Sequence, residues 1–167
     1  MADEKFLEQY GGQSVDELIA LAGAYRIDSL IMAFEQAIQQ KAATHAISAE
    51  ESLVLAVEAL EREVNNGGYN QFFFNSSNEF AGSIIEALRA IGCPKTAEIT
   101  QEAIVALGIE GDLTSEALQE VVTADDEQLE TKLSACDDRY YANTESIEDR
   151  LFEWIKKNRV HFELKNG

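Results

Sequence analysis

The hydrophobic positions of this chain recur with the three- and four-residue spacing of amphipathic helices. One face of residues 27–38 holds Ile27, Leu30, Phe34 and Ile38, with charged and amide side chains elsewhere. The same spacing recurs over residues 15–22, 53–64, 80–91, 95–107, 114–122, 129–140 and 147–155. The pattern therefore predicts an all-α fold of about seven to nine helices. We expect a loose or partly helical arm over residues 1–13 and a single compact domain over residues 14–167.

Capping residues predict where several helices begin. Ser14 with Glu17, and Ser48 with Glu51, have the spacing of a capping box, in which each side chain bonds the other residue's backbone N–H. Ser77 and Thr144 are further expected N-caps, and Pro94 suits the first position of a helix.

Glycines predict where helices end. The cluster 65–68, which contains two glycines, should stop the helix that begins after Ser48, and Gly92 and Gly108 should stop two later helices. Residues 159–167 fit either a fraying helix end or a short extended tail.

The charge of the chain is strongly negative, with 31 Asp and Glu against 13 Lys and Arg and a net charge of -18 over 167 residues. Because duplex DNA carries one charge per 1.7 Å of axis, -18 corresponds to roughly 30 Å of duplex. Residues 110–153 hold 14 acids and 3 bases, whereas residues 154–167 hold 4 Lys and Arg and a single acid. An acidic surface that only keeps the protein soluble is the alternative, and this uneven distribution weakens it.

The acidic stretch supplies the candidate partner-binding residues. Glu116 with Glu120, and Glu145 with Asp149, are four apart and so predicted to share a helical face, where like charges destabilise an isolated helix. We therefore predict a surface that binds a basic DNA-binding protein, and whose residues are Glu110, Asp112, Glu116, Glu120, Asp125, Asp126, Glu127, Glu130, Asp137, Asp138, Glu145 and Asp149.

Other chemistry finds little support in the sequence. His45 and His161 are isolated, and Cys93 and Cys136 lack metal-binding spacing, so we expect no metal, no cofactor and two buried thiols in a reducing compartment. No nucleophile-and-base motif indicates an enzyme, and the negative charge disfavours direct binding of nucleic acid. Without a secretory signal or a long apolar run, the sequence predicts a cytoplasmic protein that does not cross a membrane.

The segment NNGGYNQFFFNSSNEF, residues 65–80, is the most distinctive stretch of the chain. Its glycines permit positive φ and its aromatic residues supply large apolar surfaces, which favours a helix break followed by side chains that seal the core. A pocket lined by Asn70, Gln71 and Asn75 is the alternative, and it would belong to a small ligand-binding or enzymatic module.

This segment, the turn IGCPK at residues 91–95 and the element DRYY at residues 138–141 together resemble a bacterial family of unknown-function domains. The resemblance covers about residues 25–160. It implies an all-α fold, leaves a homodimer open, and implies kinship with an acidic DNA-mimic protein that occupies the DNA-binding surface of a transcription regulator. Our leading hypothesis is a non-enzymatic protein that imitates DNA toward a regulator or nucleoid protein, and the alternative within the binding class is an immunity or anti-nuclease protein.

Overall fold

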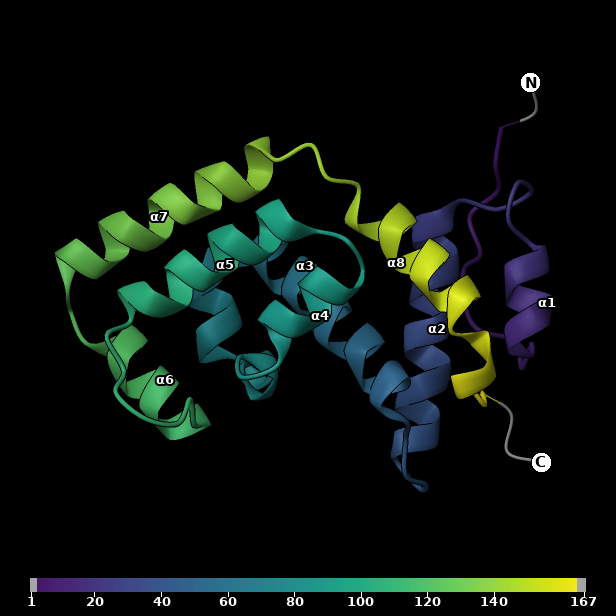
Figure 1. Cartoon of the computed structure of the whole chain (residues 1–167), viewed down its shortest axis with the longest axis horizontal. Coiled ribbons are helices and arrows are strands. Elements are labelled where there is room, and N and C mark those ends of the chain that lie inside the picture. The colour runs from purple at the N-terminus through teal and green to yellow at the C-terminus, as the bar shows by residue number, and fades with distance from the viewer. Residues whose placement is uncertain (1–2, 165–167) are drawn as a thin grey trace. The chain divides into compact units, whose positions relative to one another are not determined.

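The computed structural model describes residues 3–164 and confirms the all-α fold (Figure 1). Within this range there are eight α-helices, two short 3-10 helices and no strand. None of these helices combines the length and the apolar character that crossing a bilayer requires. The elements are α1 (Val15–Ala20), α2 (Ile27–Ala42), α3 (Ala49–Phe74), η1 (Ser76–Phe80), α4 (Ile84–Ala90), α5 (Pro94–Ala106), α6 (Ser115–Thr123), α7 (Glu127–Ala142), α8 (Ile147–Lys157) and η2 (Arg159–His161).

The chain divides into two compact units. The first unit comprises Met1–Leu55 and Ser146–Gly167, and the second comprises Ala56–Glu145. The single domain expected over residues 14–167 stays a prediction, and each unit is described by itself below.

In the first unit, α2 packs against α1 and α8. The capping box of Ser14 and Glu17 is present in full at the start of α1, as the sequence predicts. Ser48 accepts a hydrogen bond from the Glu51 N–H (3.0 Å), but the Glu51 carboxylate accepts from Lys41 Nζ (2.9 Å) and from the Glu163 N–H (3.1 Å). The second half of the predicted box at Ser48 is therefore replaced by a buried ion pair.

The N-terminal arm differs from the prediction. Residues 3–13 contain no helix, and Lys5 exchanges backbone hydrogen bonds with Ala24 (2.9 Å) and Arg26 (2.8 Å). The Tyr10 N–H donates to the Gln36 side chain at 2.8 Å. The arm is thus an extended segment bound to the turn before α2 and to α2 itself. The helical periodicity of the sequence could not reveal this, because the hydrogen-bond partners lie about 20 to 26 residues away in the chain.

The other end of the chain is also extended. Beyond η2, Phe162 is buried and packs edge-on against Phe34 and Trp154, with ring centroids 6.1 and 6.2 Å apart. Of the two expected outcomes for residues 159–167, the described part is a short 3-10 turn followed by an extended tail, and residues 165–167 lie outside the described range.

In the second unit, α5 packs against both α4 and α7, and α6 packs against η1. Figure 1 shows α5 and α7 running side by side in opposite directions. The core includes Tyr69, Phe72, Phe73, Leu88 and Leu118, all fully buried.

Two predicted N-caps in this part of the chain are wrong. Ser77 does not cap a helix, because its hydroxyl donates to the Phe72 carbonyl (3.0 Å) inside a 3-10 turn, and α4 begins only at Ile84. Thr144 precedes α8 by too many residues, since the N-cap of α8 is Ser146. The predicted starts at Pro94 and Thr114 and the glycine stops at Gly92 and Gly108 are confirmed.

Candidate partner-binding surface

A break inside α3 organises the second unit. Gly67 and Gly68 have non-helical dihedral angles, and Gly68 has φ +76° and ψ -176°, a conformation open almost only to glycine. The sequence predicted a helix stop here, but the helix resumes at once through the aromatic segment. The break leaves backbone groups on either side without partners in the helix, and these need partners from elsewhere.

Helix α7 supplies those partners. The Asp137 carboxylate accepts the Tyr69 N–H at 2.8 Å, and the Tyr141 hydroxyl donates to the Val64 carbonyl at 2.5 Å. The Tyr140 hydroxyl donates to the Glu61 carboxylate, and its ring meets the Tyr69 ring edge-on at 5.8 Å. The NNGG and DRYY segments, about seventy residues apart in the sequence, thus form one structural joint.

Two of the twelve predicted acids accept hydrogen bonds from residues that are distant in the sequence. Asp137 is half-buried, and burial raises the pKa of its carboxyl although the Tyr69 N–H acts in the opposite direction. Glu145 accepts from the Thr96 N–H (2.7 Å), the Thr96 hydroxyl (2.8 Å) and the Lys95 N–H (3.1 Å) at the start of α5. Burial would raise the pKa of Glu145, but these hydrogen bonds outweigh it and lower that pKa. Both carboxylates hold the fold together.

Glu145 and Asp149 do not share a helix, contrary to the prediction. Glu145 precedes the N-cap of α8 and belongs to the second unit, whereas Asp149 lies in the first turn of α8 in the first unit and accepts from the Ser146 hydroxyl.

The remaining ten predicted acids are exposed, and within residues 3–164 none of them forms an ion pair. Nine lie in the second unit, between residues 110 and 138. Asp126 is the N-cap of α7 and accepts from the Gln128 and Leu129 N–H groups (3.0 and 3.2 Å). On α6, Glu116 and Glu120 are exposed while Leu118 is buried. These nine acids are Glu110, Asp112, Glu116, Glu120, Asp125, Asp126, Glu127, Glu130 and Asp138, and we call them the acidic segment.

Helix α7 separates its charges onto two flanks. Its buried row is Leu129, Leu133, Cys136 and Tyr140. At 3.6 residues per turn, Glu130 and Asp137, two turns apart, lie on one side of that row.

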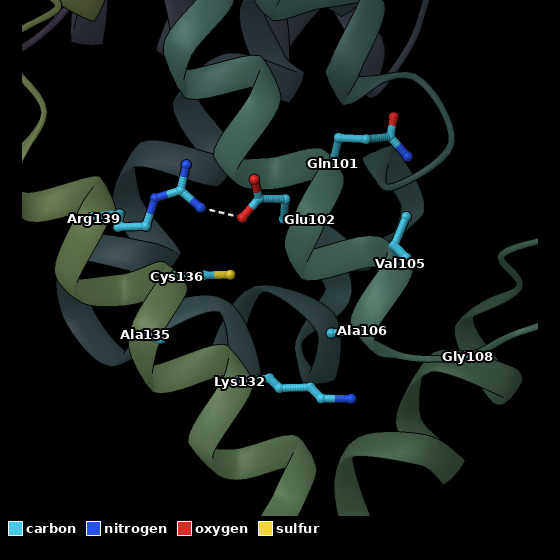
Figure 2. A pocket seen from close by; sticks show the side chains of 9 residues that line it. All are labelled: Gln101, Glu102, Val105, Ala106, Gly108, Lys132, Ala135, Cys136 and Arg139. Atoms are coloured by element: carbon cyan, nitrogen blue, oxygen red, sulfur yellow. Dashed lines mark hydrogen bonds and ion pairs between the residues drawn. The ribbon is translucent and has the colours of Figure 1, made fainter.

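Lys132 and Arg139 have the same two-turn spacing and lie on the other side of the buried row. Arg139 forms an ion pair with Glu102 of α5 across this second flank (Figure 2). The acids of α7 are therefore not neutralised by the bases of the same helix.

The three predicted pocket residues are only partly brought together. The Gln71 and Asn75 amides both donate to Glu63 Oε2, at 2.7 and 2.9 Å, while Asn70 is exposed. Phe72 and Phe73 between them are fully buried. The amides of Gln71 and Asn75 thus satisfy a carboxylate beside the break, which supports the structural interpretation of this segment.

The model of the DMP19-like protein family matches residues 45–158. The chain belongs to this family. No curated protein and no solved structure was found to match it.

The DMP19-like family is a DNA-mimic family, so the comparison supports that part of the resemblance noted in the sequence. The matched range contains the whole of α4, α5, α6 and α7, the break in α3, and all twelve predicted acids. Sequence reasoning missed Glu61 and Glu63 as anchors of the break. Nothing in their spacing distinguishes them from other acids, because their partners come from α7 and from beyond the break.

Proposed function

We propose that this protein is a non-enzymatic DNA mimic that occupies the nucleic-acid-binding surface of a transcription regulator or nucleoid protein in the bacterial cytoplasm. The observation that carries the proposal is the set of exposed, unpaired carboxylates of the acidic segment in a chain of the DMP19-like family. A basic partner would gain from these groups what it gains from phosphates, since attraction between complementary charged surfaces directs association and orientation.

The charge density of the second unit suits this role. Residues 56–145 hold 18 Asp and Glu against 5 Lys and Arg, a formal charge of -13. At one charge per 1.7 Å of duplex axis, -13 corresponds to roughly 22 Å of DNA. A compact unit of this length has a radius of gyration of about 12 Å and therefore spans roughly 24 Å, which is comparable to that length of duplex.

The arrangement on α7 adds a linear element. Glu127, Glu130 and Asp138 are exposed, and a rise of 1.5 Å per residue separates the first from the last by roughly 17 Å along the axis. That distance is about five base-pair steps of 3.4 Å along one DNA strand. Because α7 is fastened to the break in α3, these carboxylates are held at fixed spacing, which limits the entropy lost on binding.

The test is a competition experiment. The immobilised protein is incubated with host lysate, and retained proteins are eluted with a DNA duplex or with rising salt. We expect a basic DNA-binding protein that duplex DNA displaces and whose affinity falls steeply with salt. If duplex DNA displaces nothing that the protein retains, the proposal is wrong.

A matched pair of variants locates the interface. Glu127→Gln with Glu130→Gln removes two first-turn carboxylates from α7, and Glu79→Gln with Glu86→Gln removes two first-turn carboxylates from η1 and α4. Both pairs change the net charge equally. We expect the α7 pair to weaken partner binding clearly more than the control pair. If both pairs weaken binding equally, the effect comes from net charge alone and α7 is not the interface.

The same experiment decides between classes of partner. A retained nuclease whose activity the protein inhibits would support an immunity or anti-nuclease role instead. The suggested homodimer stays a prediction of the family resemblance, and light scattering after size-exclusion chromatography tests it.

A further inference from the structure

The second unit contains a groove between α5 and α7 that the proposed function does not use. Its volume is about 610 Å³, within the range typical of small-molecule sites. Val105 and Ala106 of α5 and Ala135 and Cys136 of α7 supply its apolar lining. Figure 2 shows the Cys136 sulfur directed into the space between the two helices. Burial raises the pKa of this thiol, so it is an uncharged part of the lining.

The groove also gathers positive charge in a unit that has very little. Of the five Lys and Arg side chains in residues 56–145, Lys132 and Arg139 line this groove, and Lys95 with Arg139 lines an adjoining groove of about 350 Å³. Three of the five cations therefore follow one inter-helix groove, on the flank of α7 opposite Glu130.

The two cations of the main groove are not equivalent. Arg139 is paired with Glu102, and in Figure 2 this pair joins α7 to α5 on one side of Cys136. Lys132 lies on the other side and has no ion pair or hydrogen-bond partner among the described residues. The main groove thus has an apolar middle, the Arg139–Glu102 pair at one end and an available ammonium group at Lys132 at the other.

We propose that this groove binds a small amphiphilic carboxylate, a medium-chain fatty acid in chemical class. The apolar tail lies along Val105, Ala106, Ala135 and Cys136, and the carboxylate meets Lys132. Burial of the tail supplies the affinity, and the single available cation fixes the orientation.

The dimensions favour a small ligand over a peptide. The lining residues extend over seven residue steps along each side, from Gln101 in α5 to Gly108 just beyond its end and from Lys132 to Arg139 in α7, or roughly 10 Å at 1.5 Å per residue. A groove two helical turns long is too short to dock a third amphipathic helix. The backbone groups of α5 and α7 are bonded within their own helices, so the groove offers no main-chain partners to an extended strand.

The test compares three ligands with the same tail: octanoate, octanol and octyltrimethylammonium, each below its aggregation concentration. Calorimetry gives affinities, and amide shifts at Val105 and Ala135 locate binding. We expect octanoate to bind about two- to fivefold more tightly than octanol, which is the size of one exposed ion pair. Adsorption to the acidic exterior would give the reverse order, with the cation tightest, and that order would overturn the proposal.

Variants separate the head group from the tail. In Lys132→Gln, the affinity for octanoate should fall to the affinity for octanol. Lys157 is an exposed lysine on α8 in the first unit, so Lys157→Gln should leave the affinities for octanoate and octanol unchanged. Ala135→Leu fills the groove at an exposed helical position where leucine is well tolerated. It should weaken the binding of all three ligands more than tenfold. If Ala135→Leu keeps its helical circular dichroism and still binds octanoate normally, the groove is not the site. None of these outcomes depends on the DNA-mimic function.

Discussion

Replacing Gly68 by alanine tests the joint between α3 and α7 most directly. A Cβ atom at this position would lie 2.4 Å from Asp137 Oδ2 and 2.8 Å from its Cγ. Both distances are shorter than real contacts allow, so the Asp137 side chain would have to leave the Tyr69 N–H that it accepts. Alanine would also have to adopt φ +76° with an extended ψ, which L-residues avoid.

The expected cost combines these two effects. Strain at a sparsely populated backbone conformation costs about 1–3 kcal/mol. Loss of a hydrogen bond to a charged acceptor costs about 1.5–3 kcal/mol. We therefore expect Gly68→Ala to lower the free energy of unfolding by about 3–5 kcal/mol, a large share of the 5–15 kcal/mol typical of a domain.

Two other glycines provide matched controls. Gly92 has φ +82° but nothing within 4 Å of an added Cβ, so Gly92→Ala measures conformational strain without a clash. Gly82 has neither positive φ nor a close neighbour, so Gly82→Ala should be neutral or slightly stabilising. The expected order of destabilisation is Gly68 above Gly92 above Gly82.

The assay is urea unfolding of the three variants, followed by circular dichroism, with amide hydrogen exchange at Tyr69 as a local readout. Gly68→Ala should also speed exchange at Tyr69, because its N–H loses the carboxylate partner. If Gly68→Ala is no more destabilised than Gly92→Ala, the close approach of Asp137 contributes nothing and the joint has been misinterpreted.

Three further predictions concern carboxylates and their partners. Glu145→Gln should lower the free energy of unfolding by about 1–2 kcal/mol at neutral pH, because it weakens the cap of α5. Since the folded pKa of Glu145 is lowered, the wild-type advantage should be lost as pH falls through that pKa, and urea unfolding over a series of pH values downward from pH 7 checks both points. Asp126→Ala should cost about 1 kcal/mol as the loss of the α7 N-cap, read as a shift of the urea midpoint. Lys41→Met should lower the free energy of unfolding by about 3–5 kcal/mol, because it leaves the Glu51 carboxylate, with 1% of its side chain exposed, without its cation. Glu51→Gln should lower it less. Thermal unfolding measures both variants, and the reverse order would contradict this account.

Local signals in the sequence predicted much of the helical architecture. Three of these signals act within a few residues, so they can be recognised without knowing the fold. They are the periodicity of Leu30, Phe34 and Ile38, the capping box of Ser14 and Glu17, and the proline at the start of α5. The Ser77 prediction failed for a related reason. A serine before an apolar run has the signature of an N-cap, but the Ser77 hydroxyl donates to the Phe72 carbonyl instead. Hydrophobic periodicity does not indicate the turn in which this carbonyl becomes available.

The candidate surface was predictable in composition but not in the roles of its members. Exposure of Glu127 and Glu130 follows from their positions outside the apolar row of α7, Glu127 on the face opposite that row and Glu130 on its flank. Asp137 and Glu145 belong to the same acidic run, yet each accepts hydrogen bonds from residues about fifty to seventy positions away. Nothing local distinguishes a carboxylate that caps a distant backbone from one that faces solvent, because the difference arises only when the helices pack.

The pattern on α7 explains how the second unit tolerates its charge. With 18 acids against 5 bases, ion pairs cannot balance repulsion, and Arg139 is committed to Glu102 on the flank away from Glu130. The helix is held instead by its buried row and by the hydrogen bonds of Asp137, Tyr140 and Tyr141 to the broken segment of α3. Because α7 is held by backbone and tyrosine contacts, the nine carboxylates of the acidic segment form no ion pair among the described residues, and Asp126 accepts hydrogen bonds only from the first turn of α7. A partner protein therefore does not have to break ion pairs to reach them, and a surface with that property is what imitation of a phosphate backbone requires.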